Sequence, residues 1–541
     1  MKDISSTGSF VDFTLENFIY VDKTVYIPQL VKLKRVFISR PRRFGKSLTL
    51  DTIATLFETG VEPYFKGTWI YDKWTEPTYP VLRLNFLNFD KNTLEKFNNK
   101  LNSKITEFAE LNQVTTYKEK DEAEDSIDHL LEQLRLEGRQ IVILIDEYDC
   151  QMTANINNET LYKQFQEKIK SFYANIKDKF AIKFLGITGV TRLKDVSIFS
   201  VGSDINDITN ASAYSQMIGF TRDEIKKYYI DYLKLASSYE NNCRVDDVTD
   251  TQLESMLDMM AQNYDGYCFD EDYEKKVFST WSVNKFFQTM IEKKKVQFGE
   301  YWYDNGGLPS ILVNYLKTHE LNIFEYLDKD KFLKVSSDDF KNPTALTTIN
   351  QNVLMCQTGY LTLRSDLNKT STVALGIPNG EIYKALNRLL ANNIFKGNTD
   401  ITDDYGRSLL EVGTVDDIIN LFNSALNSVS YDNYPIVSES SVQNMLKLYL
   451  LGAHQEVLSE VHEAKGRADL VVNTDNRRIV FEFKYAKNEA EAKSKLSEAV
   501  EQIKTRDYGN ILPKKNELIR IAAVFNADPK VRAFTENQIV P

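Results

Sequence analysis

Two carboxylates and a lysine stand out near the end of the chain, in the stretch GRADLVVNTDNRRIVFEFK at residues 466–484. The apolar runs LVV and RIVFEF flank the turn-forming cluster TDNRR, and this pattern predicts two adjacent antiparallel strands. Because side chains alternate along a strand, Glu482 and Lys484 would share one face while the neighbouring Phe rings take the other. Asp469 opens the first strand, so we expect all three polar groups to meet at one end of the hairpin.

Such a trio is typical of a site that hydrolyses phosphodiester bonds. Paired carboxylates hold a hard divalent cation such as Mg²⁺ through oxygen ligands, and a neighbouring lysine can orient a water or stabilise charge on a phosphate. The alternative is an ordinary solvated strand face, where a Glu/Lys pair two positions apart is common and contributes little. The presence of Asp469 across the turn from Glu482 favours the chemical interpretation.

A second group of residues that could do chemistry lies near the N-terminus, in RVFISRPRRFGKSLTLDTIATLFE. An apolar strand at residues 36–38 leads into a loop that ends in Gly45, Lys46 and Ser47, and a helical pattern follows. This is the context of a phosphate-binding loop. Backbone N–H groups at the helix start would cradle the phosphates, Lys46 would reach the β and γ oxygens, and Ser47 would ligate Mg²⁺. Arg40 replaces the first glycine of the general pattern.

The segment QIVILIDEYD supplies the acidic partners of such a loop. The unbroken apolar run at residues 141–145 predicts a buried parallel strand. Asp146 at its end would hold Mg²⁺ through water, and Glu147 would polarise the attacking water. A lone GKS could be a helix cap and a lone DE an acidic turn, but both together, each after an apolar strand, predict nucleotide binding. Whether ATP is hydrolysed or only bound is left open.

A further predicted strand, FAIKFLGITGVTRL, ends near two more polar residues. Thr188 could sense the γ-phosphate from the strand end. Arg192 could stabilise phosphate charge, or it could pair with Asp195 on the surface.

Several blocks resemble a known family. YVDKT, RPRRFGKSL, LIDEYD, GVTRLKDVSIFS and GIPNGEIY are similar to those of the bacterial AAA-ATPase-like family. The segment SEVHEAKGRADLVVNTDNRRIVFEFKYA, followed by AVEQIKTRDY, resembles the PD-(D/E)xK nuclease domain that closes such proteins. The resemblance covers most of the chain. It implies that Arg40 in the loop is this family's own version, and that Asp22 and Lys23 dock near the base or ribose, unless they form a surface ion pair.

The nuclease resemblance assigns roles by position. It implies that Asp469 and Glu482 are metal ligands and that Lys484 is the catalytic lysine. It also implies that Glu460, which precedes the GRxD element, is a further metal ligand, although Glu463 could take that place. On the following helix, Gln502 matches a family glutamine, or is simply a polar helix residue.

Length and composition indicate the class of protein that carries these sites. A chain of 541 residues is too long for one core, and 42% hydrophobic with 26% charged residues is typical of folded proteins. No apolar run approaches a membrane span and the N-terminus lacks a secretory pattern, so a cytoplasmic protein without a membrane partner is expected. Four scattered cysteines indicate neither a zinc site nor a disulfide framework. The net charge of −11 argues against a protein that coats nucleic acid non-specifically.

The expected fold class is α/β: a P-loop NTPase with a parallel sheet and flanking helices, a helical middle region, and a restriction-endonuclease-like α/β domain at the end. The helical region is marked by a capping box from Thr221 to Glu224. The expected domains are a P-loop domain at 1–214, a helical lid at 215–330, a mixed helical connector at 331–430 and a nuclease-like domain at 431–541.

We therefore expect an ATP-binding, ATP-regulated, metal-dependent nuclease that uses Mg²⁺ and cleaves DNA, with RNA as a second possible substrate. The main alternative is a nucleotide-dependent switch whose last domain binds nucleic acid or a protein without cutting. A plain ATPase with a structural tail is a third interpretation. The sequence leaves the oligomeric state open.

Overall fold

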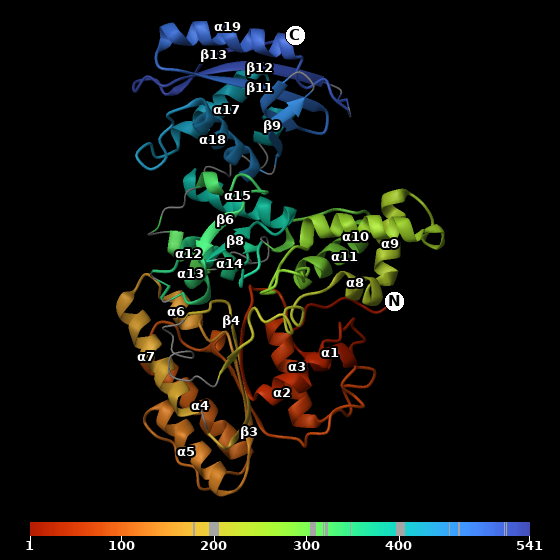
Figure 1. Cartoon of the computed structure of the whole chain (residues 1–541), viewed down its shortest axis with the longest axis vertical. Coiled ribbons are helices and arrows are strands. Elements are labelled where there is room, and N and C mark those ends of the chain that lie inside the picture. The colour runs from red at the N-terminus through yellow and green to blue at the C-terminus, as the bar shows by residue number, and fades with distance from the viewer. Residues whose placement is uncertain are drawn as a thin grey trace. The chain divides into compact units, whose positions relative to one another are not determined.

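The computed structural model in Figure 1 divides into two compact units. The first unit comprises Met1–Leu321 and Asp330–Ile382, and the second comprises Asn322–Lys329 and Tyr383–Pro541. The expected division into four domains stays a prediction. The described residues are 1–176, 179–193, 205–302, 310–316, 319, 323–343, 345–346, 348–369, 371–395, 406–453, 455–463, 466–512, 514–515 and 517–541.

The first unit is built around a parallel sheet. Its strands in the described residues run in the order β2-β3-β4-β1-β5, and every neighbouring pair is parallel. All six residues of β3 are buried, because helices cover both faces of such a sheet. The strands are β1 (Arg35–Ser39), β2 (Val81–Asn85), β3 (Ile141–Asp146), β4 (Ile182–Gly189) and β5 (Asn206–Asp207).

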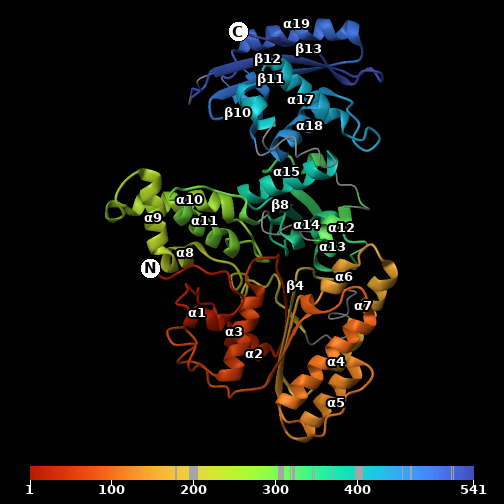
Figure 2. The ribbon, with the colours of Figure 1, turned by 180° about the vertical axis from the view of Figure 1, so that it is seen from behind.

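Helices flank this sheet on both sides. In Figures 1 and 2, α4, α5 and α7 lie side by side on one side of β3, and α1, α2 and α3 lie on the other. In α4, Phe97, Leu101, Ile105 and Phe108 recur at helical spacing and are buried. The helices are α1 (Phe10–Leu15), α2 (Ile27–Leu33), α3 (Lys46–Thr59), α4 (Leu94–Leu111), α5 (Ala123–Leu136), α6 (Cys150–Ala154) and α7 (Glu159–Ile176).

A helical region follows the sheet, as predicted. Its first helix begins at the predicted capping box, in which Thr221 and Glu224 exchange side-chain to backbone hydrogen bonds. Tyr229, Met256 and Phe287 belong to its buried core. The helices are α8 (Arg222–Tyr228), α9 (Ile230–Asn241), α10 (Asp250–Tyr264), α11 (Thr280–Lys293) and α12 (Ser310–Leu316).

The last part of the first unit contains a small antiparallel sheet of order β6-β8-β7. Its elements are β6 (Leu333–Ser336), α13 (Ser337–Lys341), α14 (Gln351–Thr358), β7 (Thr362–Leu363) and β8 (Thr372–Gly376). The next helix, α15 (Gly380–Ile394), begins in the first unit and continues into the second.

The second unit has a mixed sheet of order β13-β12-β11-β10-β9 in its described residues. The pair β11–β12 is parallel and the other pairs are antiparallel. The predicted hairpin is confirmed, with Leu470 opposite Phe481. The elements are α16 (Arg407–Val412), α17 (Val415–Asn427), α18 (Glu439–Gly452), β9 (Glu456–Glu463), β10 (Gly466–Asn473), β11 (Arg477–Ala486), α19 (Glu489–Arg506), β12 (Glu517–Asn526) and β13 (Ala533–Ile539).

The two faces of this sheet have different covers. In Figures 1 and 2, α19 lies over one face, and α17 and α18 lie on the other side. Val480 packs in one cluster with Ile503 of α19, whereas the Phe481 ring contacts Phe422 of α17. Alternation therefore places Glu482 on the α19 side. These two α/β units confirm the expected fold class.

Within the described residues, each helix is too short or too polar to serve as a membrane span.

Candidate functional site

The phosphate loop connects β1 to α3 at the carboxyl edge of the parallel sheet. Gly45 precedes the helix with φ of 102°, a left-handed conformation that glycine adopts without strain. The helix then begins at Lys46, so the amide groups of its first turn face the loop. Because strands β1 and β3 are parallel, their carboxyl ends bring this loop close to Asp146.

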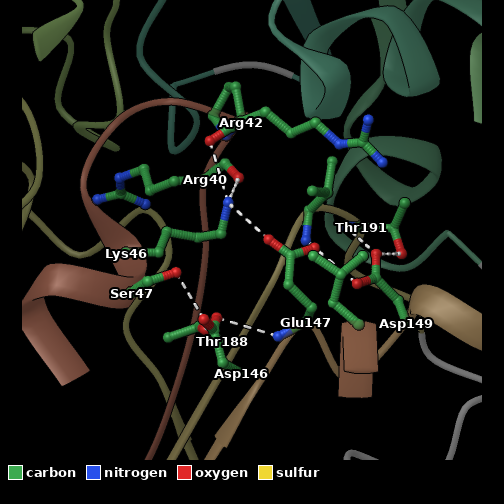
Figure 3. A network of polar contacts seen from close by, with 12 residues as sticks. Arg40, Arg42, Lys46, Ser47, Asp146, Glu147, Asp149, Thr188 and Thr191 are labelled. Atoms are coloured by element: carbon green, nitrogen blue, oxygen red, sulfur yellow. Dashed lines mark hydrogen bonds and ion pairs between the residues drawn. The ribbon is translucent and has the colours of Figure 1, made fainter. Parts of the chain in front are cut away.

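Lys46 is buried and fully engaged in this structure. Its Nζ donates to the carbonyl oxygens of Arg40 at 3.0 Å and Pro41 at 3.1 Å. It also lies 3.7 Å from Oε1 of Glu147 (Figure 3). The predicted phosphate-binding lysine and the predicted water-polarising glutamate therefore meet at one point.

Asp146 joins the loop to β4. Its Oδ2 accepts a 2.6 Å hydrogen bond from Ser47 Oγ, and its Oδ1 accepts one from Thr188 Oγ1 (Figure 3). The hydroxyl and the carboxylate expected at a Mg²⁺ ion thus converge, and these oxygen donors fit that ion. The three residues come from three separate elements, so only the sheet order brings them together.

Glu147 has an unusual backbone and environment. Its φ of 53° lies in the left-handed region, which is uncommon outside glycine and recurs at functional sites. Burial raises the pKa of its carboxyl group, the Lys46 charge opposes this, and Asp149 adds to it. A carboxylate with a raised pKa accepts a proton more readily, which suits a residue that activates water.

A cavity of about 480 Å³ opens beside the loop. It is lined by residues 5–8, 19–21, 42–49 and 217–220, and by Trp281 of α11. This volume is in the range of small-molecule and cofactor sites. The loop forms its polar end, and apolar side chains line much of the rest, as a nucleotide with a charged and an aromatic end requires.

Lys23 and Asp22 have structural partners. Lys23 Nζ lies 2.7 Å from Glu224 Oε2 and also lines the cavity. Asp22 accepts hydrogen bonds from the backbone of Thr24 and Trp69. Lys23 therefore forms an ion pair with Glu224, and the docking of Asp22 and Lys23 near the base or ribose stays a prediction.

Arg192 pairs with Asp207 at the end of β5. The expected alternative partner, Asp195, lies outside the described residues. Asp149 fixes the segment before Arg192 by accepting hydrogen bonds from Thr191 N at 2.7 Å and Thr191 Oγ1 at 2.6 Å (Figure 3). Sequence reasoning missed Asp149, although its place in LIDEYD marked it.

The hairpin of the second unit brings its predicted residues together. Glu482 is 0% exposed, and its Oε1 accepts a 2.8 Å hydrogen bond from Lys484 Nζ. Its Oε2 has no hydrogen-bond partner among the described residues. Asp469 crosses from β10 and accepts a 2.8 Å hydrogen bond from the backbone N–H of Phe483.

The electrostatics of this site are those of a crowded carboxylate pair. Burial and the Asp469 charge raise the pKa of Glu482, the hydrogen bond and charge of Lys484 lower it, and the net result is a pKa of about 7. Burial lowers the pKa of Lys484, but its hydrogen bond and ion pair with Glu482 outweigh this and raise it overall. A buried carboxylate oxygen without a donor is costly unless a cation balances it, so the donor set fits a divalent metal ion.

The third predicted metal ligand lies on β9, the strand that pairs with β10. Glu460 belongs to β9, but its side chain, like that of Glu463, lies outside the described residues. In the part of the chain that is described, no three Asp, Glu, His or Cys residues cluster as a metal site. The roles of Glu460 and Glu463 stay predictions.

Two family models match separate parts of this chain. A family model described as a predicted AAA-ATPase matches residues 5–199, and a model of the PD-(D/E)XK nuclease superfamily matches residues 437–535. The chain carries an AAA-ATPase-like domain and a PD-(D/E)XK nuclease superfamily domain.

A protein of Azotobacter chroococcum mcd 1, named "Uncharacterized protein in vnfD 5'region", is 26% identical over 535 residues, which cover 95% of this chain and 94% of the relative. Among solved structures, that of Cdc6p from Pyrobaculum aerophilum matches with 10% identity and a TM-score of 0.22, over 66% of this chain and 88% of that one.

The PD-(D/E)XK domain also contains residues that sequence reasoning missed. Glu439 is in the first turn of α18, and its Oε1 lies 3.6 Å from Lys484 Nζ. The charge of Glu439 contributes to the raised pKa of Glu482. Its only signal in the sequence is an acidic position after the helix-capping Ser438. No local pattern links it to a lysine 45 positions later.

The helix after the hairpin adds a polar group to this face. Gln502 is on α19, as expected, and its amide lies 3.5 Å from the Tyr508 hydroxyl. Arg506 donates to the same hydroxyl at 2.8 Å. This hydrogen bond is the main cause of its raised pKa, and the charges of Glu482 and Asp469 contribute less.

Proposed function

We propose that this protein is an ATP-binding, metal-dependent nuclease that cleaves phosphodiester bonds in DNA under control of its nucleotide state. The observation that carries the proposal is the buried Glu482 carboxylate, which has one oxygen bonded to Lys484 and the other without a donor beside Asp469. A solvated strand face would not bury such a carboxylate. The metal-dependent interpretation accounts for its burial.

In this proposal, Asp469 and Glu482 hold a divalent cation, with Glu460 as a third candidate ligand. When bound, such an ion supplies positive charge to the phosphate and lowers the pKa of a water. Lys484 orients the water or stabilises charge on the phosphate, because its ammonium already lies at the carboxylate pair. Glu439 holds Lys484 in place from α18.

The first unit supplies the nucleotide site in this proposal. Lys46 binds the β and γ phosphates, while Ser47 and Asp146 hold Mg²⁺. Glu147 polarises the water that attacks the γ-phosphate if ATP is hydrolysed. Support comes from the convergence of these side chains beside a cavity of about 480 Å³.

DNA cleavage by the purified full-length protein tests the nuclease. Plasmid, linear and single-stranded DNA, with RNA as a second substrate, are incubated with and without Mg²⁺ or Mn²⁺ and ATP. Asp469→Asn is expected to lose cleavage, because an amide lacks the charge that recruits a hard cation. Lys484→Ala is expected to lose cleavage with metal binding largely kept, since the lysine acts on water or phosphate.

Matched controls lie in the same hairpin. Asp475→Asn changes an exposed turn carboxylate, and Lys487→Ala changes an exposed lysine beyond the strand, so both should cleave like the parent. Persistent cleavage by Asp469→Asn would overturn the assignment. A parent that binds DNA in a nucleotide-dependent way and never cuts it would support the switch instead.

A further inference from the structure

Aromatic side chains from later parts of the first unit pack against the phosphate loop. The Phe44 ring lies 4.7 Å from the Tyr267 ring and 5.5 Å from the Phe269 ring, measured between centroids. The guanidinium of Arg40 lies 4.2 Å from the centroid of Phe269. Two loop side chains, Arg40 and Phe44, therefore pack against the segment after α10.

Two tryptophans also contact the loop. The guanidinium carbon of Arg43 lies 3.9 Å from the centroid of the Trp281 ring of α11. The Arg43 carbonyl oxygen accepts a 2.9 Å hydrogen bond from Thr280 Oγ1. The indole N–H of Trp302 donates to the carbonyl oxygen of Arg42 at 3.4 Å. We call the four rings around the loop the aromatic collar: Tyr267, Phe269, Trp281 and Trp302.

Gly359, at the end of α14, also packs closely against the loop. Its φ is 94°, and a Cβ atom there would lie 2.8 Å from Pro41 Cβ and 3.3 Å from Trp302 Cζ2. Its carbonyl oxygen accepts a 3.0 Å hydrogen bond from the Tyr267 hydroxyl. The collar and Gly359 thus contact each residue of the loop from Arg40 to Phe44.

One buried carboxylate connects the collar to α15. Glu381 is 2% exposed and lies in the first turn of that helix. Its Oε1 accepts a 2.8 Å hydrogen bond from the backbone N–H of Trp302, and its Oε2 accepts a 2.6 Å hydrogen bond from Ser282 Oγ of α11. Since α15 continues past residue 382 into the second unit, Glu381 sits where the chain passes from one unit to the other.

We propose that Glu381 and Trp302 form a transmission contact, through which phosphate binding at the loop changes the start of α15. This rests on the proposed nucleotide site. Here Lys46 donates to the carbonyl oxygens of Arg40 and Pro41. A phosphate that engages Lys46 competes with these bonds and shifts the backbone that the collar grips. Tightly packed side chains pass such a shift on, because they repack between discrete arrangements.

Hydrogen exchange of the α15 backbone amides in the full-length protein tests this contact, with Mg²⁺ and either no nucleotide, ATP or a non-hydrolysable analogue. In the parent, nucleotide is expected to change the exchange rates of the α15 amides by about fivefold or more. This factor is the lower end of typical coupling between two binding sites. Lys46→Ala is the baseline without nucleotide binding.

Three variants separate transmission from folding. Glu381→Ala removes both acceptors. In this variant the ratio of the α15 exchange rates with and without nucleotide is expected to be close to one, while its ATP affinity by calorimetry stays near the parent's. Glu381→Gln keeps an acceptor for the Trp302 N–H and is expected to retain the response. Trp302→Phe removes the indole donor to Arg42 and keeps an aromatic ring in the core, so it tests the same path if Glu381→Ala does not fold.

The outcomes are distinct from those of the nuclease test. A parent that binds ATP without any change in α15 overturns the proposal, as does a parent-like response in both Glu381→Ala and Trp302→Phe. A response that is lost in these variants and kept in Glu381→Gln supports it. If the α15 response is lost in these variants and kept in Glu381→Gln while no DNA is cut, the nuclease proposal fails and the proposed transmission contact is supported.

Discussion

At the scale of single residues, the first unit depends on one buried lysine. Lys46 is expected to be essential for nucleotide binding, because a charge-assisted contact to phosphate contributes about 1.5–3 kcal/mol, or one to two orders of magnitude in affinity. Lys46→Ala should therefore bind ATP too weakly for calorimetry while keeping a parent-like circular dichroism spectrum. Lys32→Ala, on an exposed position of α2, is the matched control. Equal ATP affinity in Lys46→Ala would exclude the phosphate-loop assignment.

Glu147 separates binding from hydrolysis at the same scale. Glu147→Gln should bind ATP and lower the turnover rate by about 100-fold or more, since it removes a general base and little else. Phosphate release measured on saturating ATP checks this. A parent without measurable turnover would make ATP a static ligand, and unchanged turnover in Glu147→Gln would leave this carboxylate without a catalytic role.

At the scale of elements, the end of β4 is fixed by close packing against the segment after β3. A Cβ atom on Gly189 would lie 2.4 Å from Tyr148 Cδ1, and that ring is fully buried. Gly189→Ala should therefore lower the free energy of unfolding by about 1–3 kcal/mol, as overpacking in a core does. Urea denaturation followed by circular dichroism measures the loss. A stability equal to the parent's would mean that Tyr148 moves aside at no cost.

At the scale of the whole molecule, the two units have separate sheets, and the nucleotide cavity lies entirely in the first. In differential scanning calorimetry, ATP with Mg²⁺ should raise the unfolding temperature of the first unit and leave that of the second unit unchanged. Binding at 100 times the dissociation constant adds about 2.7 kcal/mol to the unit that binds. Lys46→Ala should show no shift. A single transition that moves as a whole would mean that the units unfold together.

The sequence by itself determined the local parts of both sites. The strand that ends at Asp146, the loop before Lys46 and the hairpin with Glu482 and Lys484 follow from apolar runs, turn residues and strand alternation, which act over a few neighbouring residues. The order of these motifs also predicted an α/β chain with a parallel sheet first and a second α/β domain last, whereas the mixed order of strands in the second sheet came only from the structure.

Tertiary structure alone decided which distant residues complete the sites. Glu439 reaches Lys484 because α18 packs against the sheet, and Glu224 pairs with Lys23 across 201 positions of the chain. The collar around the phosphate loop and the burial of Glu381 arise in the same way. Local periodicity fixes the face on which a side chain lies, but the partner at that face depends on how the whole chain packs, and residues far apart carry no shared pattern.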